Sequence, residues 1–410
     1  MEKSAELKNK DAKVQRRHQR IWTFLWHVAP PFFKHMYSYS YDKAPEIDGS
    51  YLVLSNHVCE LDPILVGFSF PRQMYFVASE HVYRKGFVSK LLFWAFEPIA
   101  KIKGSSDTLT VMKSIRKLRS GYNVCIFAEG NRSFDGRNSP ISDATGKLVK
   151  TSGANLVTYK LEGGYLTNPR WGFGIRKGAC HGGVVQVYTK EQLKEMSVDE
   201  VNAIIRRDLR EDAYERQKML PVAFKGKNRA LGMECAYCVC PKCRSTGTIS
   251  TKENSVFCTK CGNSTEFDEY GYFNDSFGVK NTEEWEDWQN ECFKTFVSDF
   301  KDNSEPIFSD DGISMRTVDS NHNEENLGEG RMSIYLDRFE FSGLENGSYV
   351  VKKSLAINDI PDMSVYARNG FVFTDSDGVH YEITPNEKKS PLNVRKYISI
   401  WSIIRSDLKK

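Results

Sequence analysis

The central part of the chain alternates between short apolar runs and longer amphipathic stretches. The apolar runs are five or six residues long and predict β-strands at residues 51–55, 74–78, 98–102 and 123–128. The intervening stretches have helical spacing and predict helices at residues 63–70, 83–96 and 106–119. Such alternation is typical of an α/β fold with a mostly parallel sheet and helices on both faces. Functional residues in these sheets lie at the carboxyl ends of the strands.

The pattern changes in the C-terminal half of the chain. Residues 306–330 are rich in Asp, Asn, Ser and Glu, and they predict a mobile linker. Several β-type runs and a closing helix follow, which suggests a small β-rich module similar to PH domains. We therefore expect an α/β domain at 36–230, a cysteine-rich ribbon at 235–270, an acidic helix at 271–305, the linker, and the β-rich module at 331–410.

Residues 1–35 form an N-terminal segment that begins with a charged helix and becomes aromatic from Ile21 onwards. Its aromatic side chains are flanked by Arg20 and Lys34. A basic segment with Trp and Phe suits a membrane interface, where cations meet anionic lipid; packing on the next domain is the alternative. No stretch approaches the roughly 18 to 20 apolar residues of a spanning helix. The segment also lacks a small-residue cleavage site, which argues against a signal peptide.

The charge of the chain is unevenly distributed. The net charge is +4, but residues 264–327 contain seventeen acidic and four basic side chains, so they carry −13 and the rest carries +17. A basic body is a candidate for anionic partners such as phosphates, acidic lipid or nucleic acid. The composition, 40% hydrophobic and 12% aromatic, excludes a disordered chain. The mean hydropathy of −0.49 excludes a polytopic membrane protein.

The first predicted strand runs directly into a histidine with an aspartate five residues later. His57 leaves the strand and Asp62 stands at the start of the next helix. A carboxylate so placed can hold one imidazole nitrogen and leave the other as a general base that activates a hydroxyl. The alternative is that Asp62 only caps the helix and His57 is only a buried polar residue. Cys59 lies close to His57 in the sequence, which suggests a Cys–His pair with the thiol as nucleophile as a further alternative. A thiol two residues away along a turn usually points elsewhere, however.

A second polar motif follows the strand at residues 123–128. Gly130 allows a sharp turn, Arg132 offers a planar fork for phosphate oxygens, and Glu129 can hold that fork or a substrate hydroxyl. A tight turn with an Arg salt bridge is the alternative. Because both motifs leave strands of one predicted sheet, both can face a single crevice.

The two motifs together resemble those of the glycerophospholipid acyltransferase family, typified by 1-acylglycerol-3-phosphate acyltransferase. That family has an Asn-His-x4-Asp block followed by a Glu-Gly-x-Arg-Ser block, and the resemblance covers about residues 30–175. It implies that His57 deprotonates the acceptor hydroxyl, that Asp62 orients His57, and that Glu129 and Arg132 hold the glycerol phosphate. The remaining substrate-binding candidates are Gly130, Ser133 and, where an arginine is usual, Lys101 or Lys103. The implied donor is an acyl thioester of CoA or acyl carrier protein.

The cysteines predict a metal site. Six of the ten lie between Cys235 and Cys261, which points to metal binding in a reducing compartment. Two Cys-x-x-Cys pairs with suitable spacing predict a structural zinc ribbon, with ligands Cys240, Cys243, Cys258 and Cys261. A further pair, Cys235 and Cys238, could substitute for the first of these pairs.

The sequence thus predicts a cytoplasmic acyltransferase, peripheral to the cytoplasmic face of a membrane, that acylates a lysophospholipid. The expected acceptor is 1-acylglycerol 3-phosphate, which gives phosphatidic acid. Two alternatives stay open: another lysolipid or glycolipid acceptor, and a zinc-ribbon adaptor with an inactive acyltransferase body. Nucleic acid is not an expected partner, because acidic residues follow directly after the ribbon and would repel phosphate.

Overall fold

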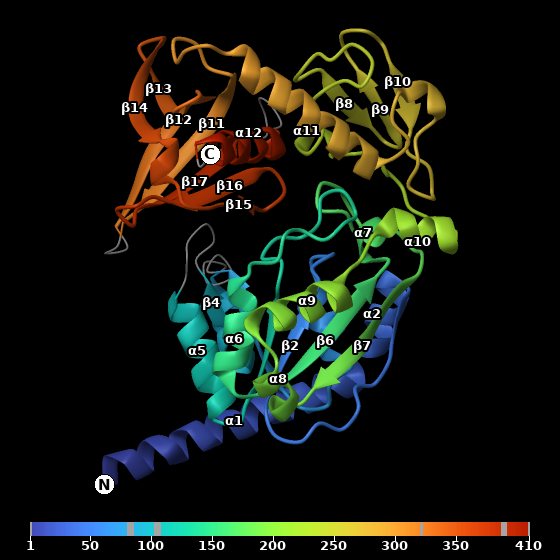
Figure 1. Ribbon diagram of the computed structural model, residues 1–410, viewed down its shortest axis with the longest axis vertical. Helices are drawn as coiled ribbons and strands as arrows, with labels where there is room; N and C mark the ends of the chain where they lie inside the picture. The colour runs from blue at the N-terminus through green and yellow to red at the C-terminus, as the bar shows by residue number, and fades with distance from the viewer. Residues whose placement is uncertain (1, 80–85, 102–107, 320–322, 387–391, 409–410) are drawn as a thin grey trace. The chain divides into compact units, whose positions relative to one another are not determined.

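The structure is a computed structural model that describes residues 2–79, 86–101, 108–319, 323–386 and 392–408 (Figure 1). The described chain divides into two compact units. The first extends to Lys225 but omits Trp171–Phe173, and the second comprises those three residues and the chain from Gly226 onwards.

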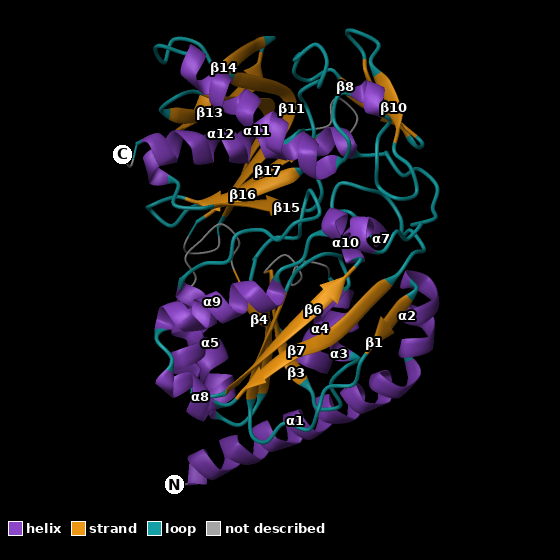
Figure 2. Cartoon of the chain, turned by 45° about the vertical axis from the view of Figure 1, so that its right-hand side comes forward, coloured by secondary structure: helices purple, strands orange, loops and turns teal. Residues whose placement is uncertain are grey.

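The first unit is built on a seven-stranded sheet with the order β1-β7-β6-β2-β5-β3-β4 (Figure 2). Its strands are β1 Tyr39–Tyr41, β2 Tyr51–Ser55, β3 Met74–Ser79, β4 Ile99–Lys101, β5 Asn123–Phe127, β6 Asn155–Glu162 and β7 Cys180–Tyr188. Strands β6 and β7 pair antiparallel, and the other neighbours pair parallel. The predicted α/β fold with a mostly parallel sheet is therefore confirmed.

Helices cover both faces of this sheet, which is why its central strands are continuous apolar runs. The helices are α1 Glu2–Val28, α2 Pro30–Tyr37, α3 Asp62–Gly67, α4 Phe87–Phe96, α5 Thr108–Arg119, α6 Ala144–Ser152, α7 Gly164–Thr167, α8 Lys190–Glu195, α9 Val198–Leu209 and α10 Ala213–Met219. Val53 of β2 lies in a core with residues of α1, α2 and α3. Leu52 and Leu54 point to the opposite face and lie in a second core with residues of α5, α6 and α9.

Helix α1 packs on the first of these cores and also presents an exposed apolar side. The indole N–H of Trp22 donates to the carbonyl of Phe70 at 2.9 Å, and that of Trp26 donates to the carbonyl of Phe68 at 2.8 Å. A Cβ added at Gly67 would lie 2.9 Å from the Trp22 ring, so α1 approaches α3 closely enough to require glycine there. Phe24, in contrast, is 63% exposed. In the described part of the chain, no helix has the length and apolar character needed to cross a membrane.

The second unit begins with the cysteine-rich segment. A small antiparallel sheet of order β10-β9-β8 is formed by β8 Ile249–Lys252, β9 Ser255–Cys258 and β10 Ser264–Glu266. The acidic helix α11, Thr282–Asp299, follows it. A separate seven-stranded antiparallel sheet of order β14-β13-β12-β11-β17-β16-β15 completes the unit together with helix α12, Val394–Asp407. Its strands are β11 Phe308–Val318, β12 Glu324–Ile334, β13 Arg338–Glu345, β14 Ser348–Ala356, β15 Met363–Tyr366, β16 Gly370–Thr374 and β17 His380–Pro385.

The expected linker at residues 306–330 is wrong, because these residues form β11 and most of β12. Ile313 and Met315 of β11 are buried at alternate positions, as in a strand with one face on a core. The polar composition misled the sequence interpretation because acidic residues occupy the other face, where Arg331 bonds Asp311 at 2.6 Å across the strand pair. The β-rich module therefore begins at Phe308, with β11, and residue 331 lies within its second strand.

Helix α11 joins the ribbon to the β-rich sheet within the second unit. The Trp285 indole N–H donates to the carbonyl of Val239 at 3.0 Å, and the Gln289 side-chain oxygen accepts from the Cys238 amide at 2.7 Å. On its other side α11 meets α12, where Arg395 forms an ion pair with Glu286. The ribbon, the helix and the β-rich sheet thus share buried contacts.

Candidate active site

The first motif folds into a closed turn between β2 and α3. The Asp62 carboxylate accepts hydrogen bonds from the amides of Val58 at 2.7 Å and Cys59 at 3.1 Å, which bends the chain back on itself. The same carboxylate lies 2.7 Å from His57 Nδ1. The N-cap position of α3 is Leu61 and no side chain caps the helix, so the alternative that Asp62 serves only as a helix cap does not hold.

His57 lies at the carboxyl end of β2 between a buried carboxylate and an aromatic ring. Its imidazole stacks on Phe127, with ring centroids 4.6 Å apart and planes 26° apart. The His57 side chain is 22% exposed, whereas the Asp62 side chain is fully buried. When Nδ1 donates to Asp62, the neutral imidazole carries its lone pair on Nε2, where it can accept a proton. This pair therefore has the geometry of a general base with its orienting carboxylate.

The thiol of Cys59 points toward the carboxylate. Its Sγ lies 2.7 Å from Asp62 Oδ1, and the residue is fully buried. Burial raises the pKa of the Cys59 thiol well above its usual value, and the charge of Asp62 adds to this. A protonated, buried thiol is a poor nucleophile, so this geometry does not support the Cys–His alternative.

The second motif lies beside the first. The Ser133 amide donates to the carbonyl of His57 at 3.1 Å, and the Ala128 amide donates to that of Ser55 at 3.1 Å. Glu129 connects the two motifs more directly, because its carboxylate accepts from the His57 amide at 3.0 Å. The sheet has thus brought together two segments that are some seventy residues apart in sequence.

Glu129 is buried and holds the two motifs together through hydrogen bonds to protein groups. In addition to the His57 amide, it accepts from the Asn138 side chain at 2.7 Å and from the Ser139 amide at 2.6 Å. Burial raises the pKa of Glu129 to about 8, although its three hydrogen bonds act in the opposite direction. The sequence interpretation expected Glu129 to hold Arg132 or a substrate. In the structure the carboxylate is occupied by protein donors.

The remaining residues of the second motif divide into turn-formers and cations. Gly130 has φ of +69°, which favours glycine, and a Cβ there would lie 3.7 Å from Lys101 Nζ. The Ser133 hydroxyl is buried and accepts from the Gly136 amide at 2.9 Å. Arg132 is half-buried and lies 3.5 Å from the Asn168 side-chain oxygen. Within the described residues neither Lys101 nor Arg132 has a carboxylate partner. Lys103 lies outside the described residues.

Sequence reasoning missed several asparagines that support the two motifs. Asn56 donates to the carbonyl of Leu161 at 2.8 Å and accepts from its amide at 2.7 Å, which fastens the end of β2 to β6. Asn138 holds Glu129, and Asn168 contacts Arg132. Asn56 could have been found from its place beside His57 in the motif. The contacts of Asn138 and Asn168 depend on how the chain returns to the site, which local patterns do not reveal.

Comparison with known proteins defines the class of the first unit. A family model described as Acyltransferase matches residues 35–162, which contain both motifs. The chain therefore contains an acyltransferase domain, and the prediction that it is an acyltransferase enzyme is confirmed.

Three solved structures show limited likeness to the chain. The crystal structure of the 1-acyl-sn-glycerophosphate (LPA) acyltransferase PlsC from Thermotoga maritima is 16% identical, with a TM-score of 0.36, over 48% of this chain and 77% of that one. Vav1 inhibited by an allosteric inhibitor, and the apo activated truncation of Vav1, are 12% and 11% identical, each with a TM-score of 0.19. Each covers 29% of this chain, which in turn spans about a third of theirs. Scores at this level do not establish a shared fold.

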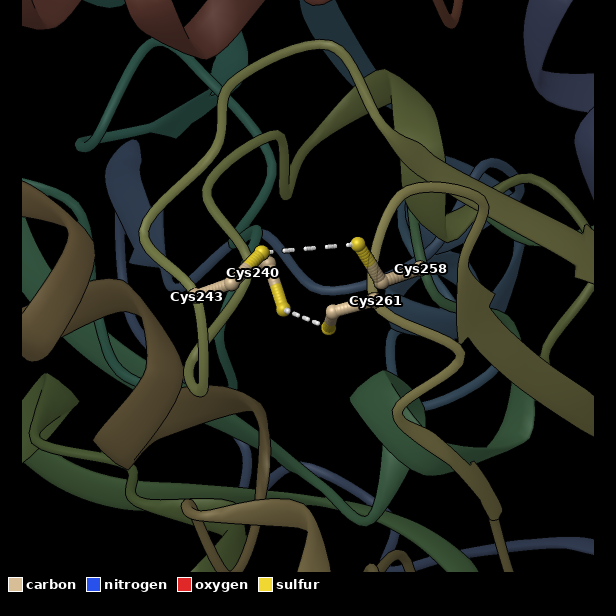
Figure 3. Close-up of side chains that lie close together, drawn as sticks. All are labelled: Cys240, Cys243, Cys258 and Cys261. Atoms are coloured by element: carbon tan, nitrogen blue, oxygen red, sulfur yellow. Dashed lines mark hydrogen bonds between the residues drawn. The ribbon is translucent and has the colours of Figure 1, made fainter.

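The four predicted cysteine ligands lie together in the second unit (Figure 3). All four Sγ atoms lie within 4.8 Å of one another, with 3.7 Å between Cys240 and Cys261 and 3.8 Å between Cys243 and Cys258. Hydrogen bonding between Cys243 and Ser245 lowers the pKa of Cys243 to about 6, which favours the thiolate that binds metals. The cluster can hold a metal ion. Cys235 and Cys238 are buried and do not belong to this group.

Proposed function

We propose that the protein transfers a fatty acyl group from a thioester to the free hydroxyl of a lysophospholipid. The observation that carries this proposal is the 2.7 Å pair of His57 Nδ1 and Asp62 Oδ2 at the carboxyl edge of the sheet. His57 Nε2 takes the proton of the acceptor hydroxyl as its oxygen attacks the thioester carbonyl. The carbon–sulfur bond then breaks, and the leaving thiolate takes up the proton from His57. An ester and a free thiol result, so no acyl-enzyme is needed.

The acceptor that we favour is 1-acylglycerol 3-phosphate, which gives phosphatidic acid. Arg132 and Lys101 are cations without a carboxylate partner in the described chain, and both lie beside the Gly130 turn. A phosphate monoester suits two such donors because it offers several charged oxygens. The donor is an acyl thioester of CoA or of acyl carrier protein. Glu129 contributes by fixing the main chain of His57.

The enzyme would work at the surface of a membrane, on its cytoplasmic face. Phe24 and Val28 are 63% and 57% exposed on α1 and share a shallow groove with the exposed cation Arg20. Phe32 of α2 is 63% exposed and lies close to Lys34 in sequence. Exposed aromatic rings with neighbouring cations are the features that bind an anionic bilayer.

We further propose that the cysteine cluster binds structural zinc. Four thiolates around Zn²⁺ at about 2.3 Å place their sulfur atoms about 3.8 Å apart in a tetrahedron. The separations of 3.7 Å between Cys240 and Cys261 and 3.8 Å between Cys243 and Cys258 agree with that geometry. Zinc bound here would stabilise the ribbon, which has a small core of its own.

Acyl transfer by the purified protein tests the central proposal. A labelled acyl thioester is offered with a panel of lysolipids, and product is compared for the wild type, His57→Ala and His181→Ala. The last variant is the matched control, because His181 of β7 also lies near a carboxylate, 3.3 Å from Asp42, but its side chain is 38% exposed. We expect His57→Ala to abolish transfer and His181→Ala to retain it. Equal product from the wild type and His57→Ala would sink the assignment and favour a binding role for the chain.

A further inference from the structure

The two oxygens of the buried Asp62 carboxylate accept hydrogen bonds from different donors. Oδ2 accepts from His57 Nδ1 and from the Val58 amide, both at 2.7 Å. Oδ1 accepts from the Cys59 amide at 3.1 Å and lies 2.7 Å from the Cys59 thiol. Among the described side chains, that thiol is the one that contacts Oδ1.

An ionised carboxylate that is fully buried is costly unless hydrogen-bond donors surround it. Asp62 has no exposure to water, so its negative charge is balanced by protein hydrogen-bond donors rather than by solvent. Cys59 can act as a donor because it stays protonated: burial and the neighbouring Asp62 both raise the pKa of its thiol. The arrangement uses a cysteine as a small, buried hydrogen-bonding group.

We propose that Cys59 is a positioning residue of the His57–Asp62 pair, whose S–H donates to Asp62 Oδ1, holds that carboxylate aligned with His57 and offsets part of its negative charge. This inference rests on the proposed function, because His57 must act as the base for the alignment to affect catalysis. Cys59 does not touch the substrate in this scheme. It acts through Asp62.

Other titratable groups near Asp62 do not replace this donor. Tyr37 of α2, Cys125 of β5 and Cys180 of β7 each have a pKa raised by burial and, secondarily, by the charge of Asp62. Glu129, whose pKa is raised to about 8, bonds to the His57 amide rather than to Asp62. Because their pKa values are raised, these groups are uncharged at mildly acidic pH and add no negative charge beside the His57–Asp62 pair there.

Removal of the thiol donor should change the pKa of His57 in one direction, upward. In Cys59→Ala the Asp62 carboxylate keeps its charge but loses a donor, so its field at His57 becomes more negative. The pKa of His57 then rises, by about one unit for the loss of one hydrogen bond to a charged group. At pH values below that pKa, the fraction of neutral His57, and with it kcat/KM, falls about tenfold. Cys59→Ser retains an O–H donor, so it restores most of the wild-type behaviour.

Two measurements on the full-length protein separate this inference from the proposed function. The His57 imidazole resonances, assigned by their loss in His57→Ala, are followed by NMR from pH 5 to 9 in the wild type, Cys59→Ala and Cys59→Ser. Acyl transfer to 1-acylglycerol 3-phosphate is measured over the same range. Cys125→Ala is the matched control, since it removes an equally buried thiol that makes no hydrogen bond to Asp62.

We expect the His57 titration and the acidic limb of kcat/KM to move together to higher pH in Cys59→Ala alone. An unchanged His57 titration in a folded Cys59→Ala protein overturns the inference, even if the enzyme is active. An equal shift in Cys125→Ala also overturns it, because the effect would then come from lost packing. If the NMR shift appears but no lysolipid is acylated, the positioning role stands and the proposed function fails.

Discussion

His57 is held by two acidic side chains that act on different parts of the residue. Asp62 holds the imidazole through Nδ1, and Glu129 holds the main-chain amide. The ring and the backbone are therefore fixed independently, which restricts where Nε2 can lie. Positioning of this kind is a large part of what a general base needs, since misplacement by about 1 Å can cost about 100-fold in rate.

Arg132 gives a test of acceptor recognition. Arg132→Ala is expected to raise KM for 1-acylglycerol 3-phosphate at least about tenfold while leaving KM for a neutral lysolipid nearly unchanged, because only the former presents a phosphate. Steady-state acyl transfer with both acceptors measures this. Arg206→Ala is the control, since that arginine pairs with Asp143 on the surface. Equal effects of Arg132→Ala on both acceptors would remove its phosphate role.

The pH dependence of folding stability tests the raised pKa of Glu129. The pKa of Glu129 is raised from 4.5 to about 8 by burial, so the folded protein holds a proton there that the unfolded chain releases. This contribution to stability is complete below about pH 4.5 and is lost as pH rises toward 8, a change of a few kcal/mol. Urea unfolding at pH 5, 6.5 and 8 should show the wild type losing stability with pH relative to Glu129→Gln. A difference between the two that does not vary with pH would contradict this.

Glu129 also illustrates the limit of residue-level prediction. Its motif marked the right turn, and the two motifs, which were expected to face one crevice, lie beside each other. The partners of the carboxylate, however, are the Asn138 side chain and the Ser139 amide, which reach it through a loop without a regular pattern. Local sequence identifies which groups can accept hydrogen bonds. It does not show which donors the fold will deliver.

At the scale of elements, strands and helices buried on both sides were predicted well. Strands β2 and β5 are uninterrupted apolar runs because both faces of the sheet are covered. Strand β11 was missed because one of its faces is exposed and acidic, so its composition resembled that of a linker. Ile313 and Met315 are buried at alternate positions, and this alternation in the sequence would have predicted the strand.

The proposed membrane binding by the exposed apolar side of α1 and α2 can be tested by substitution. Phe24→Ser with Phe32→Ser should reduce binding to vesicles that contain anionic lipid by roughly tenfold, because two large apolar side chains no longer enter the bilayer. Sedimentation with vesicles measures the bound fraction. The control is Leu109→Ser with Met112→Ser on α5, two residues that are 66% and 53% exposed. Equal loss in both double variants would contradict a specific docking side.

At the scale of the whole molecule, the acyltransferase motifs and the cysteine cluster belong to different compact units. Within the second unit, helix α11 is bonded both to the ribbon and to α12. Loss of the metal should therefore weaken the β-rich sheet as well as the ribbon, while the acyltransferase unit keeps its own core.

Calorimetry with and without a chelator checks this. We expect two unfolding transitions, of which only one moves to lower temperature, by several degrees, when zinc is removed, since bound metal contributes to folding free energy. Cys258→Ser should show the lowered transition without chelator and lose about one bound zinc per chain. Cys235→Ser, outside the cluster, should keep its zinc. Two transitions that shift equally would argue against independent units.

The close approach of Trp22 to Gly67 has a consequence for how the protein is handled. Gly67 ends the helix that Asp62 begins, so α1 packs on the last turn of the helix that carries Asp62. Deleting residues 2–28 to improve solubility would leave the core face of α3 open to water. Such a truncated protein should lose activity even toward a short-chain, water-soluble acceptor that needs no bilayer. Full activity on that acceptor would instead assign α1 to membrane anchoring alone.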